Sequence, residues 1–507
     1  MTNLNIPELH KNVIELIDSG DLENAKNIIV SVLSKKNLSK TYEPQIKFNF
    51  ASLYIDIADY YSKNAQHLDE ADLILKKTLD VFKKVEKNIP EELRLSFKLN
   101  NARVFLIKYD ALYAKKQITN NNYKLTYFEL DSIYDIEDYL LDSIKLYREC
   151  LKINLAEEEK YNIKNNTANC LIRTGRYIEA IELLEENKNI NSERWQSYAS
   201  YGDALFNFRE TGLLPLTISF YLKVIGAQTK ALSLNPYEIA KNNILNNFNI
   251  CIRDLKTYGF DFKEEFIEKN DKEEIVEFKT LDKLRQFVLK NNLALNEHSI
   301  YCKCKDAKID NLKIGRLNGS EHNMSDYDLL KLDGIVNRLL SEFSYARFLY
   351  FLHISGKTNT TEDVEFSSLS SENDLLGYCN ERLRTSYRLA YSSLDKIMNG
   401  IVELYKLNKS KNTYFENFFS KNRSELKNKN NIHLASLFSI SSELNIEIGN
   451  LKHYKKLRNE IEHDYLPINA QSISLNELQG FTLSLLQLTR SAIFSFVFLI
   501  RTETILK

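Results

Sequence analysis

Three side chains suited to chemistry on a phosphate lie close together near the end of this chain: Arg458, Asn459 and His463. An imidazole titrates near neutral pH, so it can give or take a proton. The planar guanidinium of an arginine can hold two phosphate oxygens at once. The amide of Asn459 can orient the imidazole or a phosphate oxygen. These groups are suited to proton transfer at a phosphodiester whose developing charge the arginine stabilises.

The segment that carries these residues, 452–466, has apolar positions with helical spacing. At about 100° per residue, His463 points away from the apolar stripe, Asn459 lies one turn before it on the outer side, and Arg458 lies at the edge of the stripe. Pro467 cannot continue a helix, so His463 is expected in or near its last turn. The core-facing stripe consists of Tyr454, Leu457, Ile461 and Tyr465.

The same residues also have a purely structural interpretation. Arg458 and Glu462 are four residues apart and are expected to form an exposed helix ion pair, worth about 0.3–0.5 kcal/mol. His463 would then be a solvated histidine near a helix C-terminus, where positive charge is tolerated.

The run Arg-Asn-Glu-Ile-Glu-His resembles the R-x4-6-H signature of the HEPN superfamily, helical domains of which many are metal-independent ribonucleases. The segment 389–397 is similar to a long helix of one bacterial HEPN branch, in which tetratricopeptide-like repeats precede the domain. The resemblance implies RNA cleavage by attack of the 2′-hydroxyl, in a composite site across a twofold homodimer. It also implies a role in bacterial conflict, such as antiviral defence or toxin-like growth arrest. Arg458, Asn459 and His463 would be the catalytic residues.

Three further residues are candidates for an accessory role. Asp395 and Lys396 accompany the motif in the family resemblance, although a structural ion pair inside the bundle is the alternative. His453 precedes Arg458 by five residues and is expected to reach the same surface, or else to be an ordinary solvated histidine.

The composition of the 507 residues predicts an all-α protein. Only 14 glycines and 6 prolines occur, and so few helix breakers favour helices over a turn-rich β fold. The formal net charge is -1, so RNA contacts are expected in a local patch rather than through a global basic field.

The pattern along the chain predicts three parts. Residues 1–256 are expected to form a solenoid of tetratricopeptide-like helical hairpins, whose concave groove binds a protein or peptide partner. The clearest hairpin signals are Gly20 with Ala25 and Gly175 with Ala180, in which glycine makes the turn and alanine permits close packing. Residues 257–327 are expected to be a connector containing short extended pieces. Residues 328–507 are expected to form an up-and-down helical bundle, HEPN-like by resemblance.

The six cysteines are scattered, without a disulfide framework, and suit a reducing cytoplasm. Cys302-x-Cys304 with the nearby His298 is a weak hint of metal, because this is not a usual zinc-knuckle spacing and no second pair follows. The sequence therefore predicts no metal and no cofactor.

The start of the chain has neither a basic stretch nor an apolar core, so no signal peptide is expected. The most apolar run, 483–500, contains Gln487, Thr489 and Arg490, which favours a buried core helix over a membrane span. We therefore expect a soluble, cytoplasmic protein without membrane contact.

Phosphate-binding, serine-hydrolase and zinc-protease motifs are absent from the sequence, so an ATPase, a hydrolase of that type or a zinc protease is not expected. Two functions remain: an endoribonuclease effector regulated through the repeats, and a non-catalytic interaction scaffold that dimerises through a degenerate HEPN bundle. Fold alone does not separate them.

Overall fold

The computed structural model consists of helices joined by turns and irregular loops, and the all-α prediction is confirmed. No β-strand occurs in the part of the chain that the structure describes, where one isolated bridge joins Ile468 and Ile473. The structure describes residues 5–504 except 36–41, 120–129, 191, 210–216, 316–323, 357–377, 409–411, 427, 428, 430, 448, 464–467 and 469–472.

The chain divides into two compact units, Met1–Cys170 and Leu171–Lys507, and the division falls within helix α7 (Glu157–Arg173). The helices of 171–256 therefore share a unit with the C-terminal bundle. The boundaries predicted at 256, where the repeats end, and at 327, where the bundle begins, remain predictions.

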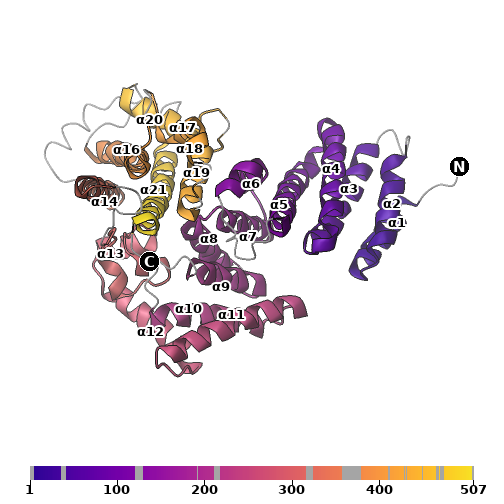
Figure 1. Ribbon diagram of the computed structural model, residues 1–507, viewed down its shortest axis with the longest axis horizontal. Helices are drawn as coiled ribbons and strands as arrows, with labels where there is room; N and C mark the ends of the chain where they lie inside the picture. Colours follow the sequence, from indigo (N-terminus) through magenta and orange to yellow (C-terminus); the bar gives the residue numbers. More distant parts are fainter. Residues whose placement is uncertain are drawn as a thin grey trace. The chain divides into compact units, whose positions relative to one another are not determined.

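The first unit is a row of helices in which each helix packs against the next (Figure 1). Its core is continuous and apolar, with Phe48, Phe50, Ile55, Leu75 and Phe82 all buried. The helices are α1 (Ile6–Asp18), α2 (Leu22–Ser34), α3 (Glu43–Ser62), α4 (Leu68–Val85), α5 (Arg94–Thr119) and α6 (Leu130–Leu151), with 3-10 turns η1 (Ala65–His67), η2 (Glu86–Asn88) and η3 (Glu91–Leu93).

The two strongest hairpin signals occupy the expected places. Gly20 and Gly175 both have φ of 81°, a left-handed conformation that glycine adopts without steric penalty. Ala25 and Ala180, each fully buried, allow the paired helices to approach closely. The tetratricopeptide-like character of these hairpins remains a prediction.

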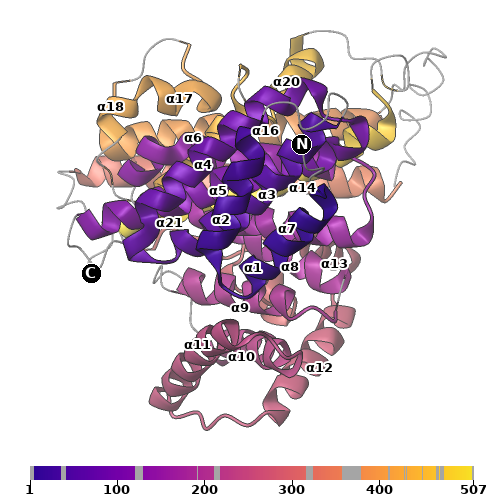
Figure 2. The ribbon, with the colours of Figure 1, turned by 90° about the vertical axis from the view of Figure 1, so that its right-hand side faces the viewer.

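The second unit begins with helices that continue this hairpin pattern. Figure 2 shows α10 and α11 side by side, and α12 also packs on α10. These helices are α8 (Tyr177–Ile190), α9 (Trp195–Arg209), α10 (Ile218–Ser233), α11 (Glu238–Thr257), α12 (Glu265–Thr280) and α13 (Lys283–Lys290).

The C-terminal bundle is built on four long helices, with three shorter ones packed beside them. Interhelical contacts connect α14 with α16, α16 with α21, and α19 with α21. The helices are α14 (Asp326–Ile354), α16 (Tyr378–Tyr405), α17 (Phe415–Lys421), α18 (Arg423–Leu426), α19 (Ile432–Leu444), α20 (His453–His463) and α21 (Leu475–Thr504).

Contacts between helix ends show in which direction each long helix of the bundle runs. Lys331 near the start of α14 pairs with Glu403 near the end of α16 at 2.7 Å, so these helices are antiparallel. Asn431, the N-cap of α19, donates to the side chain of Thr502 near the end of α21, so this pair is antiparallel too. On α21, Thr489 donates to the carbonyl of Ala390 on α16, and further along both helices Phe496 lies against Gly400, so α16 and α21 are parallel. The helices α14, α16, α19 and α21 therefore alternate in direction along the chain, as expected of an up-and-down bundle.

Helix α21 is the core of this bundle. It is long and apolar enough to cross a membrane by length and composition, but 83% of its most apolar window is buried inside the protein. Its start is fixed by Ser474, whose hydroxyl and backbone N–H both bond the side chain of Glu477. The burial agrees with the predicted core helix.

The described part of the connector contains helices α12 and α13 and no strand, and Asn296, Cys304 and Ile309 have extended backbone conformations. Two 3-10 turns follow, η4 (Glu297–Ile300) and η5 (Lys305–Lys308). The pair Asn318-Gly319 is typical of a turn, and the serine- and threonine-rich stretch 357–371 is typical of a polar loop. Both lie outside the described residues, as does the stripe residue Tyr465.

Gly175→Ala should destabilise the second unit. A Cβ at this position would lie 2.4 Å from Cδ1 and 2.6 Å from the backbone oxygen of Ile432, in addition to the left-handed φ. We expect about 1–2 kcal/mol for the backbone conformation and a further ~1–3 kcal/mol for the steric overlap. Hydrogen exchange of the amides in each unit would measure the loss. Gly20→Ala is the control, since it has the same φ but no atom within 4 Å; equal losses would contradict the steric explanation.

Candidate functional site

Helix α20 carries the candidate residues and is anchored along one side. Tyr454 and Leu457 are buried, with 5% and 6% exposure. The hydroxyl of Tyr387 on α16 donates to the carbonyl oxygen of Tyr454 at 2.9 Å, and Phe481 on α21 meets the Tyr454 ring edge-on. Ile461 is half-buried. These contacts fix the inner face of the helix.

The opposite side of α20 carries the predicted catalytic groups. His463 is exposed, as its place on the side of the helix away from the apolar stripe predicts. It is also the last residue of α20. Asn459 is half-buried and lies one turn earlier. The imidazole is therefore presented to solvent from a helix whose other face cannot move freely.

Arg458 is held by its own helix. Its Nε lies 2.7 Å from a carboxylate oxygen of Glu462, and one terminal nitrogen donates to the amide oxygen of Asn459 at 3.1 Å. The side chains of Arg458 and Glu462 are 23% and 35% exposed. The ion pair of the structural interpretation is thus present, and a phosphate would have to replace Glu462 as the partner of the guanidinium.

A cluster of ionisable groups lies beneath Arg458, between α16, α17 and α20. We call it the polar cluster; it consists of Tyr391, Asp395, Glu416, Lys455 and Arg458. Lys455 pairs with Glu416, whose side chain is only 2% exposed. The backbone N–H of Phe415 donates to Asp395 at 3.0 Å.

Burial dominates the titration of this cluster. It raises the pKa of Asp395, to which the negative charge of Glu416 adds, while the Phe415 N–H, Arg458 and Lys455 oppose the rise. Burial also raises the pKa of Tyr391, with contributions from Glu416 and Asp395. Arg458 and Asp395 therefore act on each other electrostatically.

The accessory candidates separate in space. Lys396 pairs with Glu342 on α14 at 2.6 Å and lies outside the polar cluster, whereas Asp395 belongs to it. His453 packs its ring against Tyr454 and Phe481, with ring centroids 4.4 and 5.0 Å apart. The structure thus brings Asp395, and not Lys396, toward Arg458.

Residues 324–503 match the family model described as LA2681-like HEPN. The C-terminal part of this chain is a HEPN domain. The match spans α14 to α21, and so includes Arg458, Asn459 and His463. The hairpins before residue 324 lie outside it. No curated protein matches the chain.

Sequence reasoning missed the partners of the motif within the HEPN domain. Lys455 lies one turn before Arg458 on α20, but its partner Glu416 comes from α17, and no spacing relates Glu416 to Arg458. One signal was available: Glu416 lies within the aromatic run 414–419, and an acidic residue that is buried with such neighbours needs a partner. The signal does not say which residue the partner is.

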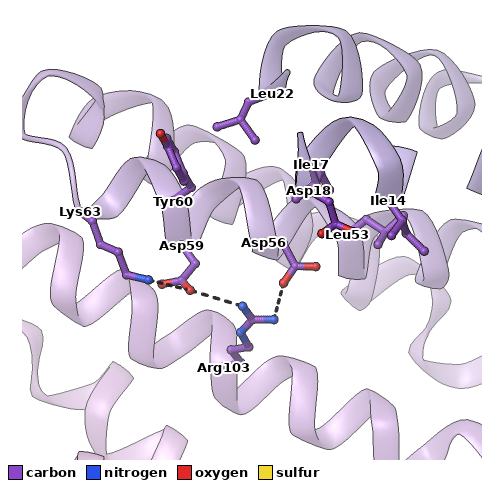
Figure 3. A pocket seen from close by; sticks show the side chains of 10 residues that line it. All are labelled: Ile14, Ile17, Asp18, Leu22, Leu53, Asp56, Asp59, Tyr60, Lys63 and Arg103. Atoms are coloured by element: carbon purple, nitrogen blue, oxygen red, sulfur yellow. Dashed lines mark hydrogen bonds and ion pairs between the residues drawn. The ribbon is translucent and has the colours of Figure 1, made fainter. Parts of the chain in front are cut away.

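The first unit contains two surface cavities that are candidates for the predicted partner groove. One, of about 420 Å³, lies among α1, α2, α3 and α5 (Figure 3). On one side of it Arg103 bridges Asp56 and Asp59, at 2.6 and 3.5 Å, and Lys63 also reaches Asp59. The other, of about 780 Å³, lies among α4, α5 and α6 and combines Phe97 and Phe105 with several lysines.

A second group of chemically active side chains lies in the connector. His298, Cys302 and Cys304, a weak hint in the sequence, place their ligand atoms within 4.8 Å of one another. The His298 Nε2 is 3.1 Å from the Cys304 sulfur. Hydrogen bonds from Cys302 and His298 lower the pKa of the Cys304 thiol below its ordinary value. Among the described residues these three form a group that could hold a metal ion, and the absence of a metal remains a prediction.

Asp395→Asn should leave the protein as stable as the wild type, or more stable, at neutral pH. The folded pKa of Asp395 is raised, so ionisation of the wild-type carboxyl weakens folding as the pH rises through that pKa. An amide keeps an acceptor for the Phe415 N–H without the buried charge. The difference in melting temperature between Asp395→Asn and the wild type, measured across pH, should vanish below the ordinary aspartate pKa.

Asp395→Ala is the control, because it also removes the acceptor and should be less stable than Asp395→Asn by about 1 kcal/mol at every pH. A lower stability of Asp395→Asn that is confined to neutral pH would show that the charge of Asp395 stabilises the fold.

Proposed function

We propose that this protein is a metal-independent endoribonuclease whose active site is built on α20 of the HEPN domain. The observation that carries the proposal is the exposed His463 at the end of a helix whose opposite face is anchored, with Asn459 and Arg458 beside it. Rigid support of an exposed acid–base group is what catalysis of proton transfer requires.

In this proposal the 2′-hydroxyl of the RNA attacks the adjacent phosphorus, and the 5′-oxygen leaves. His463 takes the proton from the hydroxyl or gives one to the leaving oxygen. Arg458 leaves Glu462 and holds the charged phosphorane, which an arginine can do through two oxygens. Asn459 positions the imidazole or a phosphate oxygen. The products are a 2′,3′-cyclic phosphate and a free 5′-hydroxyl.

One α20 supplies a single motif histidine, whereas the reaction needs both a base and an acid. A twofold homodimer through the HEPN domain would place two copies of His463 and Arg458 in one cleft. The exposure of His463 supports this arrangement, since the residue is available to a partner.

The helical hairpins would regulate the HEPN domain by binding a protein or peptide, and the cavities of the first unit offer surfaces for it. The described cysteines form no disulfide with one another, which fits a protein that works in the reducing cytoplasm. As an effector of antiviral defence or of toxin-like growth arrest, it would cut RNA once a trigger acts on the hairpins.

A non-catalytic scaffold is the second candidate. Its support is the ion pair of Arg458 with Glu462, which neutralises the guanidinium without any substrate. In that case the HEPN domain would serve only to dimerise, and loss of either side chain would have no effect on RNA.

Single substitutions His463→Ala and Arg458→Ala should each lower RNA cleavage by about 10²–10⁴-fold, the usual worth of a positioned proton-transfer group. Arg458→Lys should restore activity only in part, because an ammonium cannot hold two oxygens. The assay is incubation of the purified full-length chain with total RNA and tRNA in EDTA, with analysis of the RNA ends. Single-stranded DNA, which lacks the 2′-hydroxyl, should remain intact.

Arg338→Ala is a matched control for Arg458→Ala. Arg338 pairs with Glu342 at 2.8 Å in the same i,i+4 arrangement, on α14 of the same domain. It should lose a comparable ion pair and retain cleavage. Cleavage of DNA, or cleavage that stops in EDTA while the circular dichroism spectrum is unchanged, would contradict the proposed chemistry. Absence of cleavage by the folded wild-type chain would favour the scaffold, whereas full activity of His463→Ala would show that the chemistry takes place elsewhere.

The active form should be a homodimer. Analytical ultracentrifugation at micromolar concentration should give twice the chain mass. Dilution below the dimer dissociation constant should abolish cleavage, and cleavage should recover with second-order kinetics when the protein is concentrated again. Cleavage at a rate strictly proportional to concentration, by a species of one chain mass, would show that one motif is sufficient.

A further inference from the structure

We propose that His298, Cys302 and Cys304 bind a zinc ion, which ties together the irregular loop between α13 and α14. This site lies outside the residues that match the HEPN family, and its argument is independent of the proposed ribonuclease activity.

The three ligand atoms have the right chemistry and separation. Zinc accepts thiolate and imidazole ligands at about 2.3 and 2.0–2.1 Å, so tetrahedral binding separates such atoms by about 3.5–3.8 Å. The two sulfurs and a ring nitrogen lie within 4.8 Å of one another, and His298 Nε2 is 3.1 Å from the Cys304 sulfur. Side-chain adjustments of under about 1 Å would therefore give zinc geometry.

The other nitrogen of His298 already has the partner that a metal-bound histidine needs. Its Nδ1 lies 2.8 Å from the hydroxyl of Tyr301, which in turn lies 3.1 Å from the hydroxyl of Thr217. With Nδ1–H donating to Tyr301, the lone pair of Nε2 faces the cysteines. Such outer hydrogen bonds fix the tautomer and orientation of metal-binding histidines.

The loop that carries these residues is held in place by buried polar contacts. Asn296 is 1% exposed and donates to the carbonyls of Asp306 and Ile309 at 2.9 and 2.6 Å. Arg490, from α21, donates to the carbonyl of Ala294 and to the hydroxyl of Ser299. The ligands are therefore positioned before any ion arrives, which lowers the entropic cost of binding.

Solvent would complete the coordination. Cys302 and Cys304 are 3% and 8% exposed, but His298 is half-buried and lines a surface cavity of about 440 Å³ with Glu297 and Asp306. Two thiolates neutralise the charge of Zn²⁺, and a water from the cavity is the fourth ligand. Two cysteines and a histidine with one open position form a known type of zinc site.

The test begins with the purified wild-type chain. Elemental mass spectrometry should find about one zinc per chain, as expected of a single bound ion. Replacement by Co²⁺ should give a thiolate-to-cobalt charge-transfer band in the near ultraviolet. Removal of zinc by a chelator should lower the melting temperature, and added zinc should restore it.

Cys302→Ser, Cys304→Ser and His298→Ala should each weaken or abolish the cobalt band and lower the zinc content. Cys379→Ser is the matched control: its sulfur also contacts a histidine, His353 Nδ1 at 3.3 Å, but belongs to no three-ligand group among the described residues. It should bind zinc as the wild type does.

Folded wild-type protein with no zinc and no cobalt band would overturn the proposal, whatever the variants do. A mass lower by two hydrogens, showing a Cys302–Cys304 disulfide in protein purified without oxidant, would also overturn it. Neither outcome depends on RNA cleavage, so the zinc site and the ribonuclease can fail separately.

Discussion

The guanidinium of Arg490 lies inside the most apolar helix of the protein, with its side chain only 1% exposed. It pairs with Glu182 on α8 at 2.5 Å and donates to Ala294 and Ser299 of the connector loop. A buried charge that loses its partner costs about 3–5 kcal/mol, so α21 can pack only where these three acceptors are present. The position of α8 and of the loop relative to α21 follows from this requirement.

Two other buried arginines impose the same constraint. Arg176 is fully buried and pairs with Glu179 in its own hairpin and with Glu443 on α19. Arg347 on α14 donates to the carbonyl of Leu293 at 2.7 Å and pairs with Asp310. Each joins a helix of the HEPN domain to a segment that precedes it. The second unit is consequently larger than the family match, and the hairpin of α8 is part of the support of the domain.

The candidate site depends on the contrast between the buried and the exposed face of α20. Tyr454 and Leu457 fasten α20 to α16 and α21, while Arg458, Asn459 and His463 lie toward solvent. Between the two faces the polar cluster buries two carboxylates beside two cations. Because Glu416 is paired with Lys455, and Asp395 is held by the Phe415 N–H, Arg458 remains available to an external anion once Glu462 releases it. This is the physical basis of the proposed ribonuclease, and of the alternative scaffold if Glu462 does not release it.

The sequence by itself determined the helical class, because few breakers and 3.6-residue periodicity are local properties. It also determined the face of α20 on which His463 lies, since helix geometry converts spacing directly into direction. The glycine turns at Gly20 and Gly175 were predictable for the same reason. Only the tertiary structure decided which segments that are distant in the sequence contact one another. The polar cluster joins residues of three helices, Lys396 turns to α14 rather than to the motif, and Arg490 reaches α8. His298, Cys302 and Cys304, the proposed zinc ligands, are close in sequence, yet their convergence depends on an irregular loop that contacts of Asn296 and Arg490 hold in shape. Side chains that meet across a fold leave no periodicity in the chain, so no pattern in the sequence could reveal them.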